Sequence, residues 1–205
     1  VLSHRDTDHV GGAPAILATQ SQADVLSSIE HDHPLQALRP AQRCVAGQHW
    51  LWDGVAFDVL HPTAQDYDTP AKPNALSCVL RISNGHRSVL LAGDIEQPQE
   101  ARLVKDGANI TADVLLVPHH GSKTSSSAAF LDAVAPQWAI VQSGYRNRFG
   151  HPAGVVMARY QERGIAVVDS PHCGAFTWQS SVGDRGKEQS CQRLQARHYW
   201  QHRVP

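Results

Sequence analysis

The chain has 205 residues, and 41% of them are hydrophobic, which is enough for one globular domain with a core of its own. Its 18 Lys and Arg side chains nearly balance its 19 Asp and Glu side chains, so the formal net charge is −1. This balance excludes a general electrostatic attraction to nucleic acid or to an anionic membrane, and no run of about 18 apolar residues is present to form a transmembrane segment.

Short strands and turns are predicted for the first part of the chain. A helix is expected to start within residues 13–20, and three runs then favour strands: 23–29, 42–47 and 49–62. Residues 61–76 are rich in Pro, Asp, Thr and Asn, which predicts a long surface loop. Asn84 and Gly85 separate two apolar runs, and this pair favours the type I′ turn of a β-hairpin.

Strands and helices alternate in the second part of the chain. Helices are expected over 97–107, 125–134 and 153–164, and strands over 112–118, 137–143, 165–170 and 174–180. Alternation of this kind indicates βαβ units around a partly parallel sheet, so the predicted fold class is α/β. We expect one domain over residues 1–180, followed by a polar linker and a basic, aromatic tail over residues 181–205.

The cysteines of the chain are widely spaced, at Cys44, Cys78, Cys173 and Cys191. Because no CxxC pair occurs, a zinc site built from cysteines is not expected. Cys78 lies in an apolar run and is predicted to belong to the core. Cys173 and Cys191 are candidates for a disulfide if the protein works in an oxidising compartment.

The stretch LSHRDTDHVGG, residues 2–12, brings four metal-binding side chains into six positions: His4, Asp6, Asp8 and His9. In an extended segment alternate side chains point to one side, which would bring His4, Asp6 and Asp8 together, and a turn at His9 would add the fourth. Imidazole nitrogens and carboxylate oxygens are ligands in zinc, manganese and iron sites. The alternative is a solvated loop whose acidic residues cap the next helix, but the density of ligands favours a metal site.

Two further apolar runs end in possible metal ligands. Asp94 closes the run LLAGD, and His119 and His120 close the run LLVPHH. A carboxylate at the end of a buried strand is well placed to bridge two ions, and histidines are common ligands. The next residues offer hydroxyls and a cation that suit phosphate oxygens: Ser122, Lys123 and Thr124. The alternative for both runs is an ordinary turn or a polar loop with a helix cap.

Another polar run, SGYRNRFGHP, follows a predicted strand at residues 143–152. Tyr145, Arg146, Asn147 and Arg148 offer groups that hold a phosphodiester and stack a base, and His151 adds an imidazole. A solvated connector explains Arg148 nearly as well. Since sites of α/β folds lie at the carboxyl ends of strands, we expect these runs to share one edge of the sheet.

Taken together, these motifs resemble the metallo-β-lactamase superfamily, whose H-x-H-x-D-H signature appears here as H-x-D-x-D-H, with Asp6 in place of the second histidine. This variant, with GDIE, VPHHGSKTSSS, PNALS (Asn74 and Ser77) and GYRNRFGHP, resembles the C-terminal β-lactamase-like domain of the ComEC family of competence DNA-uptake proteins. The resemblance covers nearly all of residues 1–180. It implies a metallo-β-lactamase-like αββα sandwich, here without its N-terminal strands.

The resemblance also implies a hydrolytic site with two divalent metal ions. The implied metal ligands are His4, Asp6, Asp8, His9, Asp94 and His119, or His120 in place of His119. Asp8 is implied to orient the attacking water, and His120 or His151 to protonate the leaving oxygen. The implied substrate-binding residues are Ser122, Lys123, Thr124, Tyr145, Arg146 and Asn147.

The donor set differs from that of the family at large. Asp6 replaces a histidine, and the family's histidine between the first motif and the bridging aspartate has no counterpart, because the matching region reads PNALS. Oxygen-rich sites suit harder ions, so we expect Mn²⁺ to be favoured, with Zn²⁺ or Mg²⁺ as alternatives.

The function implied by the resemblance is a metal-dependent phosphodiesterase or nuclease that degrades the non-imported DNA strand during competence DNA uptake. The implied partners are DNA and the membrane channel portion of the same full-length protein. The implied location is that of a soluble domain on the extracytoplasmic face of the inner or cytoplasmic membrane, with the cytoplasm as the alternative. Two other functions stay open: a non-catalytic module that binds DNA or gates the channel, and a small-molecule metallo-hydrolase of the same superfamily.

Overall fold

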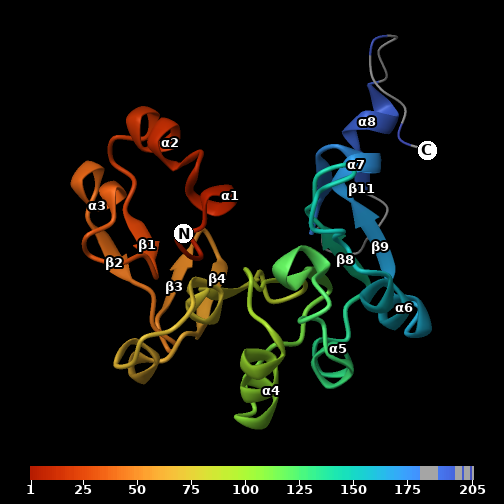
Figure 1. The fold of residues 1–205 in the computed structure, drawn as a ribbon, viewed down its shortest axis with the longest axis horizontal. Helices are drawn as coiled ribbons and strands as arrows, with labels where there is room; N and C mark the ends of the chain where they lie inside the picture. Colours follow the sequence, from red (N-terminus) through yellow and green to blue (C-terminus); the bar gives the residue numbers. More distant parts are fainter. Residues whose placement is uncertain (181–188, 197–199, 201–203, 205) are drawn as a thin grey trace.

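The computed structural model describes residues 1–180, 189–196, 200 and 204, so most of the predicted linker and much of the predicted tail lie outside the described residues. A seven-stranded mixed sheet forms the centre of the molecule (Figure 1). Its strands, in spatial order, are β3 (His49–Trp52), β4 (Val55–His61), β5 (Val79–Ser83), β6 (Ser88–Leu91), β7 (Val114–Leu116), β8 (Trp138–Val141) and β9 (Ala166–Asp169). Neighbours are antiparallel from β3 to β6 and parallel from β6 to β9. The parallel strands therefore end at one edge of the sheet.

The hairpin between β5 and β6 is confirmed, but the predicted type I′ turn is wrong, because the loop spans residues 84–87 and only Gly85 of the Asn-Gly pair has a positive φ. Gly85 has a positive φ of +82°, which side chains other than glycine adopt at a cost. The Asn84 side-chain oxygen accepts hydrogen bonds from the backbone N–H groups of His86 (3.0 Å) and Arg87 (2.9 Å). The turn residues thus supply both the backbone freedom and the hydrogen bonds that reverse the chain.

Three helices cover one face of the sheet: α4 (Gln97–Lys105), α5 (Ala128–Val134) and α6 (Gly154–Glu162). Their apolar faces pack on the strands to form the main core, which contains Leu90, Leu103, Leu115, Phe130, Leu131, Val141, Val156 and Tyr160. Glu100 of α4 is fully buried, and its carboxylate accepts the backbone N–H groups of Ser126 (2.5 Å) and Ser127 (2.8 Å) just before α5. The three helices predicted for this half of the chain are confirmed.

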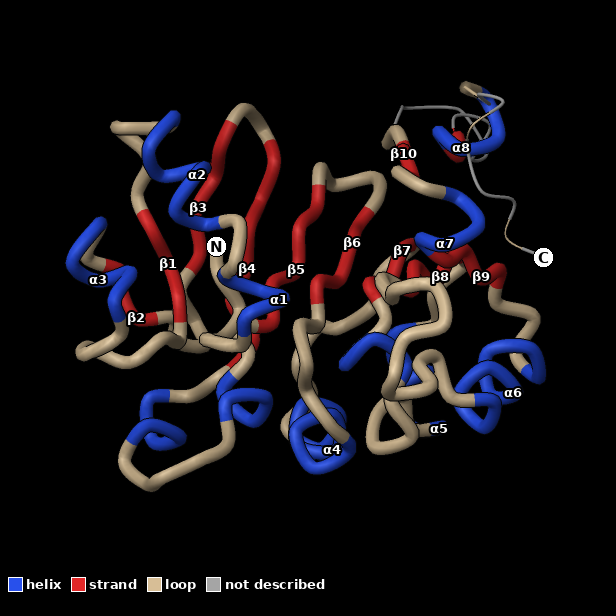
Figure 2. Tube along the Cα trace, turned by 45° about the horizontal axis from the view of Figure 1, so that its top comes forward, coloured by secondary structure: helices blue, strands red, loops and turns tan. Residues whose placement is uncertain are grey.

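A second, smaller sheet lies on the face of the main sheet opposite α4, α5 and α6. It pairs β1 (Val25–Ser27) with β2 (Ala41–Arg43) in parallel. Leu26 of β1 packs toward the main sheet in a cluster with Val59 and Leu80, whereas α2 (Ala13–Thr19) and α3 (Pro34–Leu38) cover the outer side of β1 and β2. Figure 2 shows α2 and α3 beside this sheet and α4 to α6 on the opposite side of the molecule. The layers thus run helix, sheet, sheet, helix.

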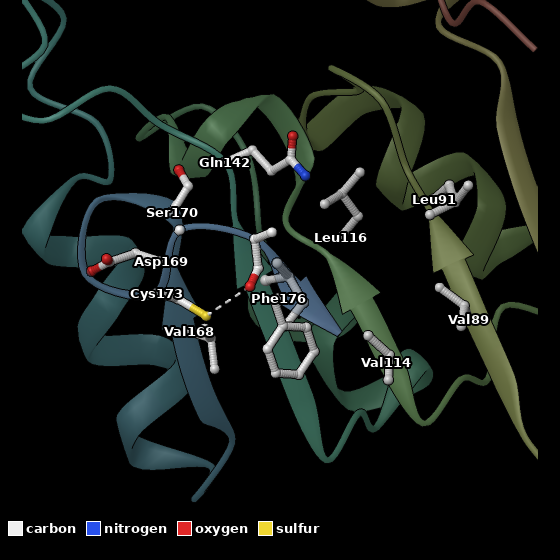
Figure 3. Close-up of a pocket in the computed structure, with 13 residues that line it drawn as sticks. Val89, Leu91, Val114, Leu116, Gln142, Val168, Asp169, Ser170, Cys173 and Phe176 are labelled. Carbon is white, nitrogen blue, oxygen red and sulfur yellow. Dashed lines mark hydrogen bonds between the residues drawn. The ribbon is translucent and has the colours of Figure 1, made fainter. Parts of the chain in front are cut away.

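The chain returns across the sheet in its last part through α7 (Ser170–Cys173), β10 (Phe176–Trp178), β11 (Gln189–Cys191) and α8 (Gln192–Gln195). The strand predicted over residues 174–180 exists as β10, but it pairs with β11 and not with the main sheet. Cys173 and Cys191 form the disulfide that the sequence suggested. Beneath this segment, Val89, Leu116 and Phe176 help to line an apolar cavity of about 350 Å³ (Figure 3).

The region predicted as a surface loop, residues 61–76, is more ordered than expected. It contains two short 3₁₀ helices, η1 (Ala64–Tyr67) and η2 (Pro73–Leu76), and it begins at His61, whose side chain is only 1% exposed. The prediction of a surface loop is confirmed for residues 63–76, which are exposed or half-buried, and wrong for His61 and Pro62, whose burial composition alone does not reveal. Among the described residues, no helix is long and apolar enough to cross a membrane.

Candidate metal centre

Side chains from three distant segments meet beside the carboxyl ends of β6 and β7. Residues 4–9 follow the bridge between Leu2 and Ser27, Asp94 follows β6, and His120 follows β7. The first segment is not extended throughout, because α1 (Thr7–Val10) forms a helical turn in which the N–H groups of His9 (2.8 Å) and Val10 (3.1 Å) donate to the carbonyl of Asp6. The prediction of an extended segment through Asp8 is thus wrong.

The first group of possible ligands contains His4, His9 and Asp94. The two imidazole rings lie 4.1 Å apart between centroids, and Asp94 Oδ1 lies 3.2 Å from His9 Nε2. His4 is 1% exposed and Asp94 is 5% exposed. His4 Nε2 is buried without a hydrogen-bond partner and lies 3.9 Å from Asp94 Oδ2. An unpaired buried imidazole nitrogen beside a carboxylate is a fitting ligand for a divalent cation.

The second group contains Asp8, His9 and His120, and it shares His9 with the first. His120 Nε2 lies 3.1 Å from Asp8 Oδ2, 3.5 Å from Asp94 Oδ2 and 3.4 Å from His9 Nε2. The other ring nitrogen, Nδ1, donates to the carbonyl of Gln142 at 2.7 Å, which leaves Nε2 to face the centre. Asp94 is thus a member of the first group and also lies next to His120 of the second, which is the position predicted for a carboxylate that bridges two ions.

The turn that carries His120 needs an unusual backbone. His119 and His120 have positive φ values of +47° and +54°, and Gly121 follows at +79°. A Cβ atom at Gly121 would lie 2.7 Å from Cβ of Pro152, so a larger residue does not fit there. Left-handed conformations cost non-glycine residues about 1 kcal/mol or more, and such strain is often found at functional sites.

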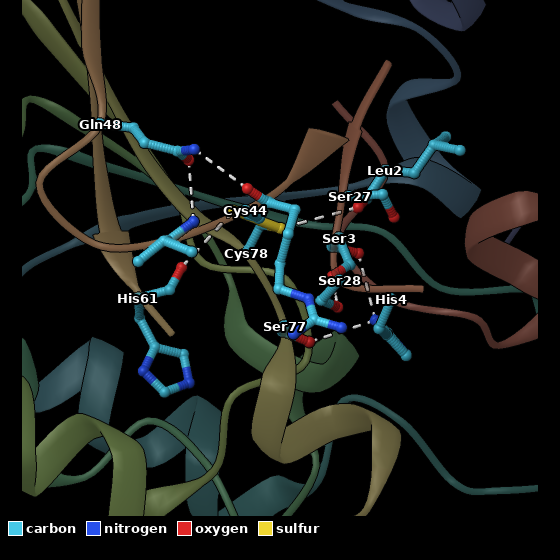
Figure 4. Close-up of a disulfide and its surroundings, with 12 residues drawn as sticks. Leu2, Ser3, His4, Ser27, Ser28, Cys44, Gln48, His61, Ser77 and Cys78 are labelled. Carbon is cyan, nitrogen blue, oxygen red and sulfur yellow. Dashed lines mark hydrogen bonds between the residues drawn. A yellow bond between two sulfur atoms is a disulfide. The ribbon is translucent and has the colours of Figure 1, made fainter. Parts of the chain in front are cut away.

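Serine hydroxyls contact the Nδ1 atoms of the His4 and His9 rings. Ser77 Oγ lies 3.1 Å from His4 Nδ1 and accepts the backbone N–H of Asp94 at 3.0 Å. Ser3 Oγ lies 3.1 Å from His4 Nδ1 and 2.9 Å from His9 Nδ1. Figure 4 shows both serines on the same side of His4, toward the disulfide of Cys44 and Cys78. With Nδ1 engaged in this way, Nε2 of each ring is directed to the centre.

Protons and charges are strongly coupled in this cluster. Burial alone would raise the pKa of Asp94, but hydrogen bonds from His120 and His9 outweigh it and lower that pKa well below its usual range. The hydrogen bond to Asp94 raises the pKa of His120 to about 9. Burial and the charge of His9 lower the pKa of His4. Without a cation, the cluster thus keeps a proton on His120 to balance the buried carboxylate.

Two predicted ligands lie outside both groups. Asp6 lies beside the first group, with its Oδ2 atom 3.6 Å from His4 Nε2. His119 is oriented differently from His120: its Nδ1 lies 3.2 Å from Glu96 Oε1, and its Nε2 faces the Asn74 amide at 3.3 Å. The geometry therefore favours His120 over His119 as a ligand.

The pocket that opens above the cluster has a volume of about 860 Å³. Its wall includes Asp8, Asp94, His120 and His151. The predicted phosphate-binding residues Ser122, Lys123 and Thr124 do not line it, and neither do Tyr145 and Arg146.

Thr124 Oγ1 instead donates to Glu96 at 2.7 Å, while Ser122 is buried. Asn147 and Arg148, both named from the run SGYRNRFGHP, do line the pocket, and Phe149 of the same loop, which was not among the expected site residues, lines it as well. No regular pattern marked Phe149, since it stands between a charged residue and a glycine.

Comparisons with known proteins bear on the family and the fold of the chain. A family model described as the metallo-beta-lactamase superfamily matches residues 1–144. The chain is 38% identical over 203 residues to "Competence protein ComA" of Neisseria gonorrhoeae, which covers 98% of this chain and 27% of that protein. It is 36% identical over 174 residues to "Recombination protein 2" of Haemophilus influenzae, which covers 85% of this chain and 21% of that protein. The chain thus spans about a quarter of the length of these relatives.

A solved structure shares the fold. Igni18, described as a novel metallo hydrolase from the archaeon Ignicoccus hospitalis, superposes with a TM-score of 0.54 at 18% sequence identity. The match covers 82% of this chain and 73% of Igni18.

Proposed function

The chain belongs to the metallo-β-lactamase superfamily, and from that premise we propose that it is a metal-dependent phosphodiesterase that degrades the non-imported DNA strand during competence DNA uptake. The α/β class and the layered sandwich predicted from the sequence are confirmed, and this fold usually houses a metal-dependent hydrolase. One observation carries the proposal most directly. Two groups of His and Asp side chains share His9, and Asp94 belongs to one group and lies beside the other. Both groups contribute side chains to the wall of a pocket of about 860 Å³.

The residues that would hold the cations are His4, His9 and Asp94 in one group and Asp8, His9 and His120 in the other. When bound, divalent cations supply Lewis-acid chemistry, which activates water and offsets the charge of a phosphodiester. We propose Mn²⁺ as the preferred ion, with Zn²⁺ or Mg²⁺ as alternatives, because Asp8 and Asp94 add carboxylate oxygens to the three histidines of the two groups. Asp6 lies beside the groups, 3.6 Å from His4 Nε2, so Asp6→His would place a further nitrogen donor there and should shift the preference toward Zn²⁺.

The protein's own groups are proposed to position water and to move protons. Asp8 is 63% exposed at the pocket, so its carboxylate can accept a hydrogen bond from the attacking water. His120 has both ring nitrogens engaged, by Gln142 and by the carboxylates. His151 lines the pocket without such contacts to Asp8 or Asp94, which makes it the better candidate to protonate the leaving oxygen.

The biological role rests on the named relatives and on the cysteines. Relatives that are 38% and 36% identical to this chain over the aligned residues are named for competence and recombination, which supports DNA as the substrate. The cysteines form the pairs Cys44–Cys78 and Cys173–Cys191. Disulfides persist in oxidising compartments, which supports a position on the extracytoplasmic face, attached to a membrane channel portion of the same full-length protein.

A second candidate function is a non-catalytic module that binds DNA or gates the channel. It is favoured by the near-zero net charge and by the residues between the first motif and Asp94, where Asn74 and Ser77 face the site and no further histidine joins the ligand groups that the described residues form. A metal content below one ion per chain, with DNA binding retained, would favour this function. Hydrolysis of a small ester in preference to DNA would instead favour a small-molecule metallo-hydrolase.

The test is cleavage of end-labelled single-stranded and double-stranded DNA by metal-free protein reconstituted with Mn²⁺, Mg²⁺ or Zn²⁺. We expect cleavage with Mn²⁺ at a higher rate than with Zn²⁺, and a loss of at least about 100-fold in Asp8→Ala. Asp132→Ala is a matched control, since Asp132 is a carboxylate of similar exposure, 64%, in α5 and does not line the pocket. No cleavage with any ion, or equal cleavage by Asp8→Ala, would contradict the proposal.

A further inference from the structure

One large aromatic side chain stands exposed at the rim of the candidate metal centre. Phe149 is 66% exposed, and it lines the same pocket as Asp8, Asp94 and His120. Burying a phenyl ring gains about 1.5–3 kcal/mol, so an exposed ring at a polar site is informative when it stands beside possible ligands. The ring is available for a partner that brings an apolar face of its own.

The loop that carries Phe149 is held in shape by one side chain. Asn147 Oδ1 accepts the backbone N–H groups of Phe149 (3.2 Å) and His151 (3.0 Å), and its Nδ2 donates to the carbonyl of Gly144 at 3.0 Å. The next part of the loop is tied to the metal-site turn, because Ala153 N–H donates to the carbonyl of Gly121 at 2.8 Å. Phe149 therefore lies in a closed loop. Asn147, which was predicted to bind substrate, instead makes the hydrogen bonds that close this loop.

Charged and aromatic groups surround the ring in a way that suits a nucleotide. The guanidinium carbon of Arg148 lies 4.8 Å from the Phe149 ring centroid, and the His151 ring lies 5.8 Å away at an interplanar angle of 18°. His151 in turn lies 5.7 Å from the ring of His119, beside the cluster. An aromatic face next to an arginine is the combination that binds a base and its phosphate in single strands.

We propose that Phe149 is a stacking platform for one unpaired nucleobase, with Arg148 against the neighbouring phosphate, and that this platform makes the site selective for single-stranded nucleic acid. The proposal rests on the proposed function and names its substrate class. A base inside a duplex is already stacked on both faces, so Phe149 can receive it only after it has been unpaired, which costs a few kcal/mol. An unpaired strand avoids that cost.

The test measures binding without metal, so that it does not depend on catalysis. The 205-residue chain, in EDTA at a fixed salt concentration, is titrated against fluorescent oligothymidylate and against an abasic oligonucleotide of equal length. We expect Phe149→Ala to weaken oligothymidylate binding by about 5- to 100-fold and to leave abasic binding within about twofold. Phe149→Trp should retain the wild-type affinity, and Phe149→Leu should behave like Phe149→Ala, because leucine keeps the apolar bulk but not the aromatic face.

Trp52→Ala is the matched control, since Trp52 is an aromatic side chain of similar exposure, 67%, on β3 and away from the site. Equal oligothymidylate affinities of wild type and Phe149→Ala, or an equal loss on the abasic strand, would overturn the stacking platform. A separate assay tests the proposed function: hydrolysis of bis(p-nitrophenyl) phosphate, a small phosphodiester that contains no base. If the protein hydrolyses this diester but shows no preference for single strands over duplex, the inference fails and the proposed function stands.

Discussion

His119 and His120 are adjacent in the sequence, but their rings serve different partners. His120 directs Nε2 to Asp8 and Asp94, whereas His119 lies between Glu96 and Asn74. We therefore expect His120→Ala to weaken Mn²⁺ binding by at least about 100-fold, as removal of a ligand should, and His119→Ala to weaken it by about tenfold or less. Isothermal titration of metal-free protein measures both. The reverse order would assign the ligand role to His119.

Ser77 is expected to act on the metal through His4. Its hydroxyl joins His4 Nδ1 and the Asp94 backbone, and it carries no charge that could itself attract a cation. Ser77→Ala should lower the affinity for Mn²⁺ by about 10- to 100-fold, because groups that orient ligands contribute about that much. Ser88→Ala, at another buried serine away from the centre (8% exposed, against 0% for Ser77), should change the affinity less than about twofold. Equal effects of the two substitutions would argue against the orienting role.

The sequence predicted the ligands that follow strands and missed the groups that support them. Asp94 and the pair His119 and His120 could be predicted, because each follows an apolar strand and strand ends share an edge of the sheet, but the sequence did not reveal which of the two histidines faces the centre. Ser3 and Glu96 carry no comparable signal, since their roles depend on hydrogen bonds to rings placed by the fold. Phe149 was missed because exposure cannot be read from an isolated aromatic residue.

At the scale of elements, regular patterns were predicted well and short turns were not. The hairpin at Asn84 and the alternating strands and helices after residue 112 are confirmed, because periodicity and turn chemistry determine them locally. The turn of α1, only four residues long, has no period to detect. It changes which neighbours meet, because it brings His9 rather than Asp8 against His4.

The segment between β4 and β5 is anchored by a partly buried network around His61. Arg102 of α4 donates to Asp66 (2.6 Å and 2.7 Å) and to His61 Nδ1 (2.8 Å), and His61 Nε2–H donates to the carbonyl of Ala75 at 2.8 Å. Ala75 lies in η2, the element that carries Asn74 to the edge of the metal centre. This network therefore couples the packing of α4 to the shape of the site.

Asp66→Asn is expected to lower the free energy of unfolding by about 1–3 kcal/mol at pH 7, because an amide cannot accept both Arg102 hydrogen bonds. Burial alone would raise the pKa of Asp66, but the bonds from Arg102 and Thr63 outweigh it and lower the pKa below the ordinary value of 3.8. The folded state thus holds fewer protons, so this contribution is complete above about pH 4 and is lost as the pH falls through the folded-state pKa. Urea unfolding at pH 7 and near pH 3 measures it, and an equal difference at both pH values would contradict the assignment.

At the scale of the whole molecule, a crosslink holds the last described elements to the domain. Cys173 in α7 and Cys191 in β11 are separated by 18 positions, and β10 pairs with β11 between them. Replacing both cysteines by serine should lower the free energy of unfolding by about 3 kcal/mol, as expected for closure of a loop of this length. Urea unfolding of the oxidised proteins measures the difference. Equal stability of the variant and the wild type would show that this crosslink does not restrain the unfolded chain.

Residues from three segments of the chain are proposed to form a site for two divalent ions, and the metal content of the protein tests this proposal. Metal-free protein is incubated with excess Mn²⁺, passed through a desalting column and analysed by mass spectrometry for metal per chain. We expect about two ions in the wild type and fewer than one in Asp94→Ala, because Asp94 borders both ligand groups. Less than one ion per chain in the wild type, or an unchanged metal content in Asp94→Ala, would contradict a two-ion site at these residues.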